Sequence, residues 1–392
     1  MRRAALALAA LALVTADLAP AASLAQSRPV GLRPLTTTDE GGLWDLFDKA
    51  EQQVRASGEL DTDPALNAYV RDVMCKVAAD YCQDIRVYVL DRPFLNAQVG
   101  ANGYAEVWSG LLLRASNEAQ LAFVLGHETS HFAENHSVKR MRTQRNNTNV
   151  AMILSLGAAA AGVNLVNLVY LGSVAATLSY GREEESEADD LGLKRAAKAG
   201  YDPAAAVTIW QAVTNEVAVS DFDKVRKSDA HGSIFADHPL THERVAALAA
   251  ELKTLPAGGE VGQARHRAAI RPHLAAWLTD DLRRRDFGET LQIIDRLAAD
   301  DEDLGVLNFY RGEAYRQRHR DDDLPRAKDA YLKATAYPDA PFGAWRELGD
   351  LRKRDNDPAG ARVAYETYLL KAPEAEDAWI VRDALANLEK GS

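Results

Sequence analysis

The sequence predicts a mainly α-helical protein that contains one small β-sheet and continues into a solenoid of helical repeats. Three observations lead to this prediction. Apolar residues recur at helical spacing along most of the chain, two strand-like stretches lie between residues 85 and 112, and residues near the C-terminal end recur at 34-residue intervals. With 392 residues, the chain is long enough for two or three domains that each bury a core.

The composition excludes several functional classes. The chain carries 46 Lys and Arg against 57 Asp and Glu, a formal net charge of −11, so it lacks the basic excess with which proteins bind nucleic-acid phosphates. Its 2 cysteines cannot form a disulfide-dense scaffold or a Cys-based zinc finger. We therefore expect protein or peptide partners and no nucleic acid.

Residues 1–25 have the pattern of an export signal peptide. Arg2 and Arg3 precede a stretch rich in Ala and Leu, and the small residues Ser23 and Ala25 mark a cleavage site. We expect cleavage near Ala25 and a location in a bacterial periplasm. An uncleaved anchor is the alternative, which the short apolar stretch disfavours.

The exported chain is expected to begin with two helices. Asp39 is placed to cap the first, whose residues Trp44, Phe47 and Val54 recur at helical spacing. The pair Asp63-Pro64 is typical of a second helix start, because Asp caps the free N–H groups and Pro fits the first turn.

Cys75 and Cys82 lie near the end of that second helix, in a compartment that permits disulfides. On one continuous helix they would be about 10 Å apart, beyond disulfide reach. A bond therefore requires the helix to end before Tyr81. A disulfide and two buried free thiols both remain open at this point.

The period then changes to that of β-strands. Residues 85–90 alternate in polarity, and a second strand-like stretch runs from Tyr104 to Leu112 after a cluster of turn residues. We expect this second stretch to be an edge strand that pairs with an extended substrate through Tyr104, Glu106 and Trp108.

The next helix, capped by Ser116 or Asn117, carries the motif His127-Glu128-Thr-Ser-His131. Residues four apart share a helix face, so both imidazoles can reach one Zn²⁺. Glu128 then lies where it can take a proton from water at the metal.

A zinc site with two histidines needs a third protein ligand. In the acidic stretch 183–190, Glu185 and Asp189 are four apart and share a helix face. One carboxylate can therefore bind the metal while the other orients an imidazole. Taken alone, the stretch favours a solvated acidic helix start, whereas together with the upstream histidine motif it favours the metal site.

Two further histidines are candidates near this site. His136 follows His127 by nine residues, one short of the three-histidine spacing of other zinc peptidases, and we interpret it as structural. His238 precedes Pro239 in an expected loop and is a candidate fourth ligand. An ordinary surface histidine is the alternative for His238.

Residues 150–179 are mostly apolar, and their length alone permits a membrane span. Gly and Asn residues interrupt them, so we favour two helices that pack on the catalytic domain or contact substrate or lipid at the membrane surface.

The C-terminal third, residues 256–392, contains the repeats. Ala327 and Tyr331 are echoed by Ala361 and Tyr365, and the pattern resembles a tetratricopeptide unit, in which small residues let paired helices approach and aromatic residues fill the seam. Two units are recognisable. We expect weaker half-units on either side, at residues 274–298 and 374–388.

These motifs together resemble the HtpX/CAAX-prenyl-protease family of zinc metallopeptidases, the forty-eighth family of the metallo class. With the export signal and the repeats, the chain is similar to periplasmic BepA-type members, which act in outer-membrane protein quality control. The resemblance covers about residues 40–250 and the C-terminal third. It rests on Asn96-Ala97, Gly103-Tyr104, Ser109-Gly110-Leu111-Leu112, the His-Glu-x-x-His motif, Glu185 with Asp189, and His238-Pro239-Leu240 followed by Arg244.

The resemblance implies a zincin-like α+β peptidase domain over residues 26–255 that binds one zinc ion per chain. The implied roles are His127, His131 and Glu185 as zinc ligands, Glu128 as catalytic base, Asp189 and Arg244 as supports behind the ligands, and His238 as a gate or transition-state donor.

Two functions of different classes follow from the sequence. The first is a zinc endopeptidase for misfolded or stalled outer-membrane proteins, with repeats that bind clients or the outer-membrane assembly machinery. The second is a repeat-based periplasmic chaperone or scaffold with a structural or latent zinc site. Glu128 favours the first, because binding alone needs no base.

Overall fold

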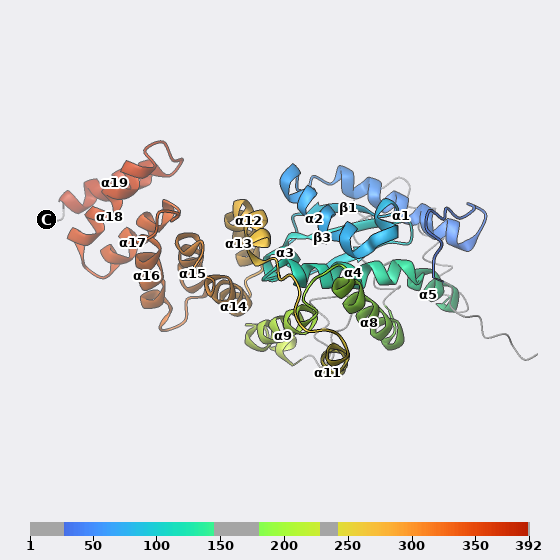
Figure 1. Cartoon of the computed structure of the whole chain (residues 1–392). Helices are drawn as coiled ribbons and strands as arrows, with labels where there is room; N and C mark the ends of the chain where they lie inside the picture. Colours follow the sequence, from blue (N-terminus) through green and yellow to red (C-terminus); the bar gives the residue numbers. More distant parts are fainter. Residues whose placement is uncertain (1–26, 145–179, 228–241, 391–392) are drawn as a thin grey trace, which may run out of the picture.

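The computed structural model describes residues 27–144, 180–227 and 242–390 (Figure 1). As predicted, the described chain is mainly helical with one small sheet and a C-terminal series of helices. Helix α1 (Asp39–Ala56) is capped by Thr38, one residue before the expected Asp39, because the Thr38 hydroxyl accepts the Gly41 N–H.

Helix α2 (Pro64–Ala78) begins as predicted, with Asp63 as its cap and Pro64 in its first turn. It ends before Tyr81 and continues as the short 3₁₀ helix η1 (Ala79–Gln83). That break brings Cys75 and Cys82 to a Cα–Cα distance of 4.6 Å, and the two form a disulfide.

The sheet has three strands in the order β1-β3-β2. Strands β1 (Arg86–Leu90) and β3 (Tyr104–Trp108) run parallel, and β2 (Ala97–Val99) is antiparallel to β3. The expected second strand is therefore too long at its end, because helix α3 (Ser109–Arg114) begins directly after Trp108. The apolar pair Leu111-Leu112 fits the end of a buried strand and a buried helix equally.

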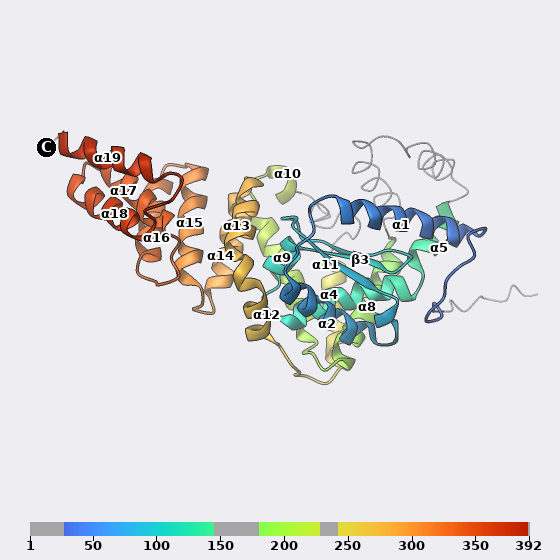
Figure 2. The ribbon, with the colours of Figure 1, turned by 90° about the horizontal axis from the view of Figure 1, so that it is seen from above.

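Helix α4 (Glu118–Ala133) lies at the centre of the N-terminal part, and all of its residues are buried. Strand β2 and helices α2, α8 (Arg182–Lys198) and α9 (Ala204–Val219) pack around it (Figures 1 and 2). The remaining described elements of this part are α5 (His136–Gln144), α10 (Asp223–Arg226), α11 (His242–Glu251) and η2 (Leu252–Thr254).

The C-terminal helices stack side by side and extend away from the sheet (Figure 2). They are α12 (Gln263–Ile270), η3 (Arg271–His273), α13 (Leu274–Arg283), α14 (Phe287–Ala298), α15 (Leu304–Arg318), α16 (Asp323–Ala334), α17 (Gly343–Arg354), α18 (Pro358–Lys371) and α19 (Ala378–Lys390). Residues 274–298, expected as a half-unit, form the complete pair α13 and α14.

Each recognisable repeat has a glycine where the partner helix presents a tyrosine. A Cβ on Gly312 would lie 2.4 Å from the Tyr331 ring, and one on Gly349 would lie 2.5 Å from the Tyr365 ring. The two contacts are equivalent, and in each only a glycine leaves room for the tyrosine ring. They support a helical repeat region.

The repeat helices share a hydrophobic core with the N-terminal part. Leu274, Trp277 and Ile293 belong to the same buried cluster as Leu121 and Phe123 of α4. A buried charge network also crosses this junction: Arg114 of α3 bonds Glu216 of α9 and Asp281 of α13. Described residues before and after residue 255 therefore share one core, and the domain division near residue 255 stays a prediction.

In the described ranges, no helix has both the length and the hydropathy that a membrane span requires. The expected contacts of residues 150–179 and the signal peptide at residues 1–25 lie outside those ranges.

Candidate metal centre

Helix α4 carries the two histidines of the site on one face. Asn117 caps this helix by accepting the Gln120 N–H at 2.9 Å. His127 and His131 are at most 2% exposed, and their Nε2 atoms are 3.0 Å apart. The sequence spacing thus produces the expected convergence of two imidazoles.

Two glycines allow α8 to cross α4 closely at this level. A Cβ on Gly192 of α8 would lie 2.7 Å from the backbone nitrogen of His127, and one on Gly126 of α4 would lie 3.0 Å from the Gly192 carbonyl. Glu185 and Asp189 precede Gly192 on the same helical stripe. The close crossing therefore brings both carboxylates against the histidines.

Glu185 completes a cluster of three ligand-type residues. Its Oε2 lies 3.7 Å from His127 Nε2, and its Oε1 lies 3.6 Å from His131 Nε2. Zinc bonds of 2.0–2.1 Å in tetrahedral geometry separate ligand atoms by about 3.4 Å. The three side chains, all buried, thus fit a zinc ion in both donor chemistry and spacing.

Asp189 and Arg244 support these ligands from behind. Asp189 Oδ1 lies 3.1 Å from His127 Nδ1, which leaves His127 Nε2 directed at the cluster. Arg244 of α11 bonds both Asp189 oxygens at 2.8 Å and Glu185 Oε2 at 2.7 Å. Burial would raise the pKa of Asp189, but bonds from Arg244 and His127 outweigh it and lower the pKa.

Glu128, the expected base, is buried beside His127 with 2% of its surface exposed. Burial disfavours the charge of Arg244, yet the carboxylates of Asp189, Glu185 and Glu128 together raise the Arg244 pKa. The Glu128 carboxylate therefore lies within electrostatic reach of the ligand cluster.

His131 is contacted on its other side by residues that sequence reasoning did not assign to the site. Its Nδ1 lies 2.8 Å from His136 Nδ1, and His136 Nε2 lies 3.0 Å from Glu187 Oε2. The Tyr180 ring stacks on the His131 ring at a centroid distance of 3.8 Å. The sequence does not reveal the His136 contact, although the two residues are close along the chain, because the contact depends on how the chain turns after α4.

The residues expected to bind substrate do not form an edge. β3 is the central strand, so the expectation of an edge strand at Tyr104, Glu106 and Trp108 is wrong. These side chains instead bond one another: Tyr104 and Trp108 both donate to the Glu106 carboxylate. Among the described strands, β2 has a partner on only one side and packs on α4.

His238, the candidate gate, lies in residues 228–241, outside the described ranges. The structure therefore brings together His127, Glu128, His131, Glu185, Asp189 and Arg244, and leaves His238 as a sequence-based expectation.

A buried two-histidine, one-carboxylate cluster with a glutamate beside the first histidine is the arrangement of a metallopeptidase. Comparison with known families agrees, because residues 61–252 match the model of peptidase family M48. The chain thus carries an M48 peptidase domain, as the sequence motifs predicted.

The curated relatives are proteases of two kinds. The chain is 25% identical over 248 residues to the beta-barrel assembly-enhancing protease of Escherichia coli strain K12, a match that covers 60% of this chain and 49% of that protein. It is 32% identical over 146 residues to the mitochondrial metalloendopeptidase OMA1 of Schizosaccharomyces pombe, covering 36% and 42% respectively. The chain therefore matches about half or less of each relative's length.

Proposed function

We propose that the chain is a zinc-dependent endopeptidase of protein quality control. The observation that carries this proposal is the convergence of His127, His131 and Glu185 next to the buried Glu128. These three residues would hold one zinc ion, whose Lewis acidity lowers the pKa of water to about 7 and polarises a carbonyl.

The remaining chemistry belongs to the chain's own residues. Glu128 takes the proton of the attacking water and returns it to the leaving amine, which is general base and then general acid catalysis. Asp189 holds His127 in the tautomer whose Nε2 faces the cluster. Arg244 keeps the Glu185 carboxylate in place while compensating its buried charge.

An extended substrate would pair with β2 rather than β3. β2 packs on α4 and, among the described strands, pairs only with β3, so its other side faces away from the sheet. Main-chain hydrogen bonds to such an edge give affinity without demanding one sequence. This mode suits a protease that acts on unfolded segments of varied composition.

The clients we propose are unfolded or stalled outer-membrane proteins in the periplasm. Support comes from the expected export signal and from the relatives named beta-barrel assembly-enhancing proteases. The repeat helices would bind clients or assembly proteins. They carry a pocket of about 410 Å³ between α15, α16 and α17.

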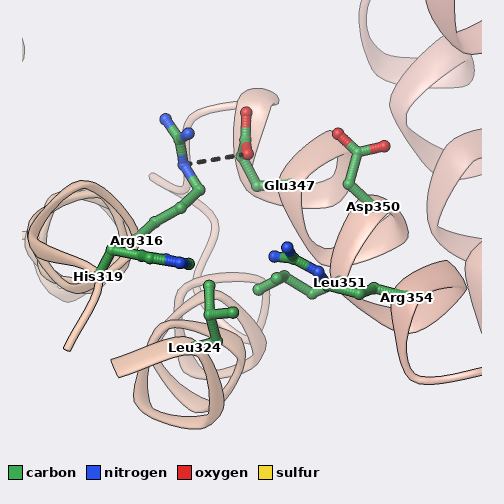
Figure 3. A pocket seen from close by; sticks show the side chains of 7 residues that line it. All are labelled: Arg316, His319, Leu324, Glu347, Asp350, Leu351 and Arg354. Atoms are coloured by element: carbon green, nitrogen blue, oxygen red, sulfur yellow. Dashed lines mark ion pairs between the residues drawn. The ribbon is translucent and has the colours of Figure 1, made fainter. Parts of the chain in front are cut away.

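Charges of both signs line this pocket (Figure 3). Arg316 Nε lies 3.2 Å from Glu347 Oε2, and Arg354 and Asp350 stand at its other side. A mixed lining of this kind suits a polar peptide segment better than an apolar one.

The test is cleavage of an unfolded outer-membrane protein by wild type and by Glu128→Gln, with zinc measured in both. We expect both proteins to contain zinc and only wild type to cleave, because the amide keeps the shape of Glu128 but cannot accept a proton. Full cleavage by Glu128→Gln would refute the mechanism. Client binding without cleavage by zinc-loaded wild type would indicate a scaffold instead.

A further inference from the structure

We infer that His136 is a positioning residue for the metal centre. It links the Glu187 carboxylate to the ligand His131. This inference rests on the proposed zinc site. It concerns the side of His131 opposite the cluster, where Nδ1 lies 2.8 Å from His136 Nδ1. His136 is itself fully buried, and its Nε2 lies 3.0 Å from Glu187 Oε2.

The hydrogen-bond partners dictate where the protons lie. A carboxylate only accepts, so His136 Nε2–H donates to Glu187. His136 Nδ1 of the neutral ring is then an acceptor, and His131 Nδ1–H must donate to it. His131 is left with its lone pair on Nε2, the atom that lies 3.0 Å from His127 Nε2.

The two ligand histidines are therefore supported in parallel from one helix. Asp189 of α8 contacts His127 Nδ1 directly, at 3.1 Å. Glu187 of α8 reaches His131 Nδ1 through His136. Both arrangements fix the ring orientation and the tautomer, and such supports raise the basicity of the ligating nitrogen.

The turn after α4 places His136 for this role. Asn135 adopts a left-handed conformation with φ 54°, which lets His136 begin α5 beside the His131 ring. The buried Arg28 holds this turn, because it donates to Asn135 Oδ1 at 3.2 Å and to the Ala101 carbonyl at 2.8 Å.

The experiment compares zinc affinity, measured by competition with a chromogenic chelator, in purified full-length protein and its variants. His136→Phe keeps an aromatic ring and removes both hydrogen bonds, so we expect zinc to bind about 10- to 100-fold more weakly. His136→Gln can still accept from His131 and donate to Glu187, and it should recover most of the lost affinity.

Glu187→Gln tests the far end of the link at a side chain that is 46% exposed and easily replaced. We expect weaker zinc binding, and we expect no added loss when Glu187→Gln is combined with His136→Phe, because both changes break one chain of contacts. Asp190→Asn is the matched control: it removes a charge from the same helix, and Asp190 pairs with Lys194 instead.

Zinc affinities of Glu187→Gln and of folded His136→Phe equal to that of wild type would overturn the inference and leave His136 a packing residue. Additive losses in the double variant would also overturn it. If wild type itself binds no zinc, the proposed function is refuted. If wild type binds zinc tightly and the variants bind it equally tightly, only the inference about His136 is refuted.

Discussion

Replacing Gly192 by alanine should weaken zinc binding more than it weakens the fold. The new Cβ would lie 2.7 Å from His127 N and 2.8 Å from His127 Cα, whereas ordinary contacts begin near 3.4 Å. Helix α8 must therefore retreat by about 0.7 Å, and it carries Glu185 and Asp189 with it. Backbone atoms of α4 offer no flexible side chain that could yield instead.

The size of the effect follows from two opposing terms. Overpacking of this kind costs about 1–3 kcal/mol, and the better helix propensity of alanine returns about 1 kcal/mol. The metal-free protein can relax by separating the helices, but zinc requires the close crossing. The overpacking energy therefore reduces the free energy of zinc binding, and 1–3 kcal/mol corresponds to a loss of about 5- to 150-fold in zinc affinity.

The assay is chelator competition for zinc together with thermal unfolding of the metal-free protein. Gly126→Ala, whose Cβ would lie 3.0 Å from the Gly192 carbonyl, should show a smaller loss of affinity. Gly42→Ala in α1 is the control, because its Cβ meets nothing within 4 Å. Unchanged zinc affinity in Gly192→Ala would show that the close crossing does not position the ligands.

Three other predictions concern the ligands and the junction with the repeats. Glu185→Ala should remove most zinc from the purified protein, whereas Asp189→Asn should weaken zinc binding about 10- to 100-fold. Zinc loss from Glu183→Ala and not from Glu185→Ala would show that a different face of α8 binds the metal. Asp281→Asn should lower the free energy of unfolding in urea by about 3–5 kcal/mol, because it leaves the buried Arg114 and the partly buried Arg284 without that carboxylate; a change below about 1 kcal/mol would contradict this. Burial would raise the pKa of Asp281, but these arginines outweigh burial and lower the pKa. The stabilisation from the charged Asp281 is therefore present above about pH 4 and is lost as pH falls through the pKa of the folded protein. The difference in unfolding free energy between wild type and Asp281→Asn should shrink below about pH 4.

Local signals in the sequence were sufficient for two helix starts. Asp63-Pro64 and Asn117 cap their helices as expected, because a side-chain acceptor before a helical run acts over three residues. The ligands on α4 were also predictable from local sequence, since a spacing of four residues places both histidines on one helix face.

What the sequence could not show depends on contacts between distant segments. The central position of β3 follows from how β1 and β2 pair with it, and a strand-like stretch at residues 104–108 fits an edge strand and a central strand equally. The link from Glu187 through His136 to His131 arises only after α4 ends and α8 crosses it. The shared core at residue 255 was equally hidden, because each repeat helix looks amphipathic by itself.

The most direct measurement is a titration of metal-free protein with zinc while cleavage of an unfolded outer-membrane protein is followed. We expect one tight site per chain, cleavage that rises in proportion to its occupancy, and neither signal in Glu185→Ala. Cleavage by the metal-free protein, or zinc bound as tightly by Glu185→Ala as by wild type, would contradict a zinc centre built from His127, His131 and Glu185.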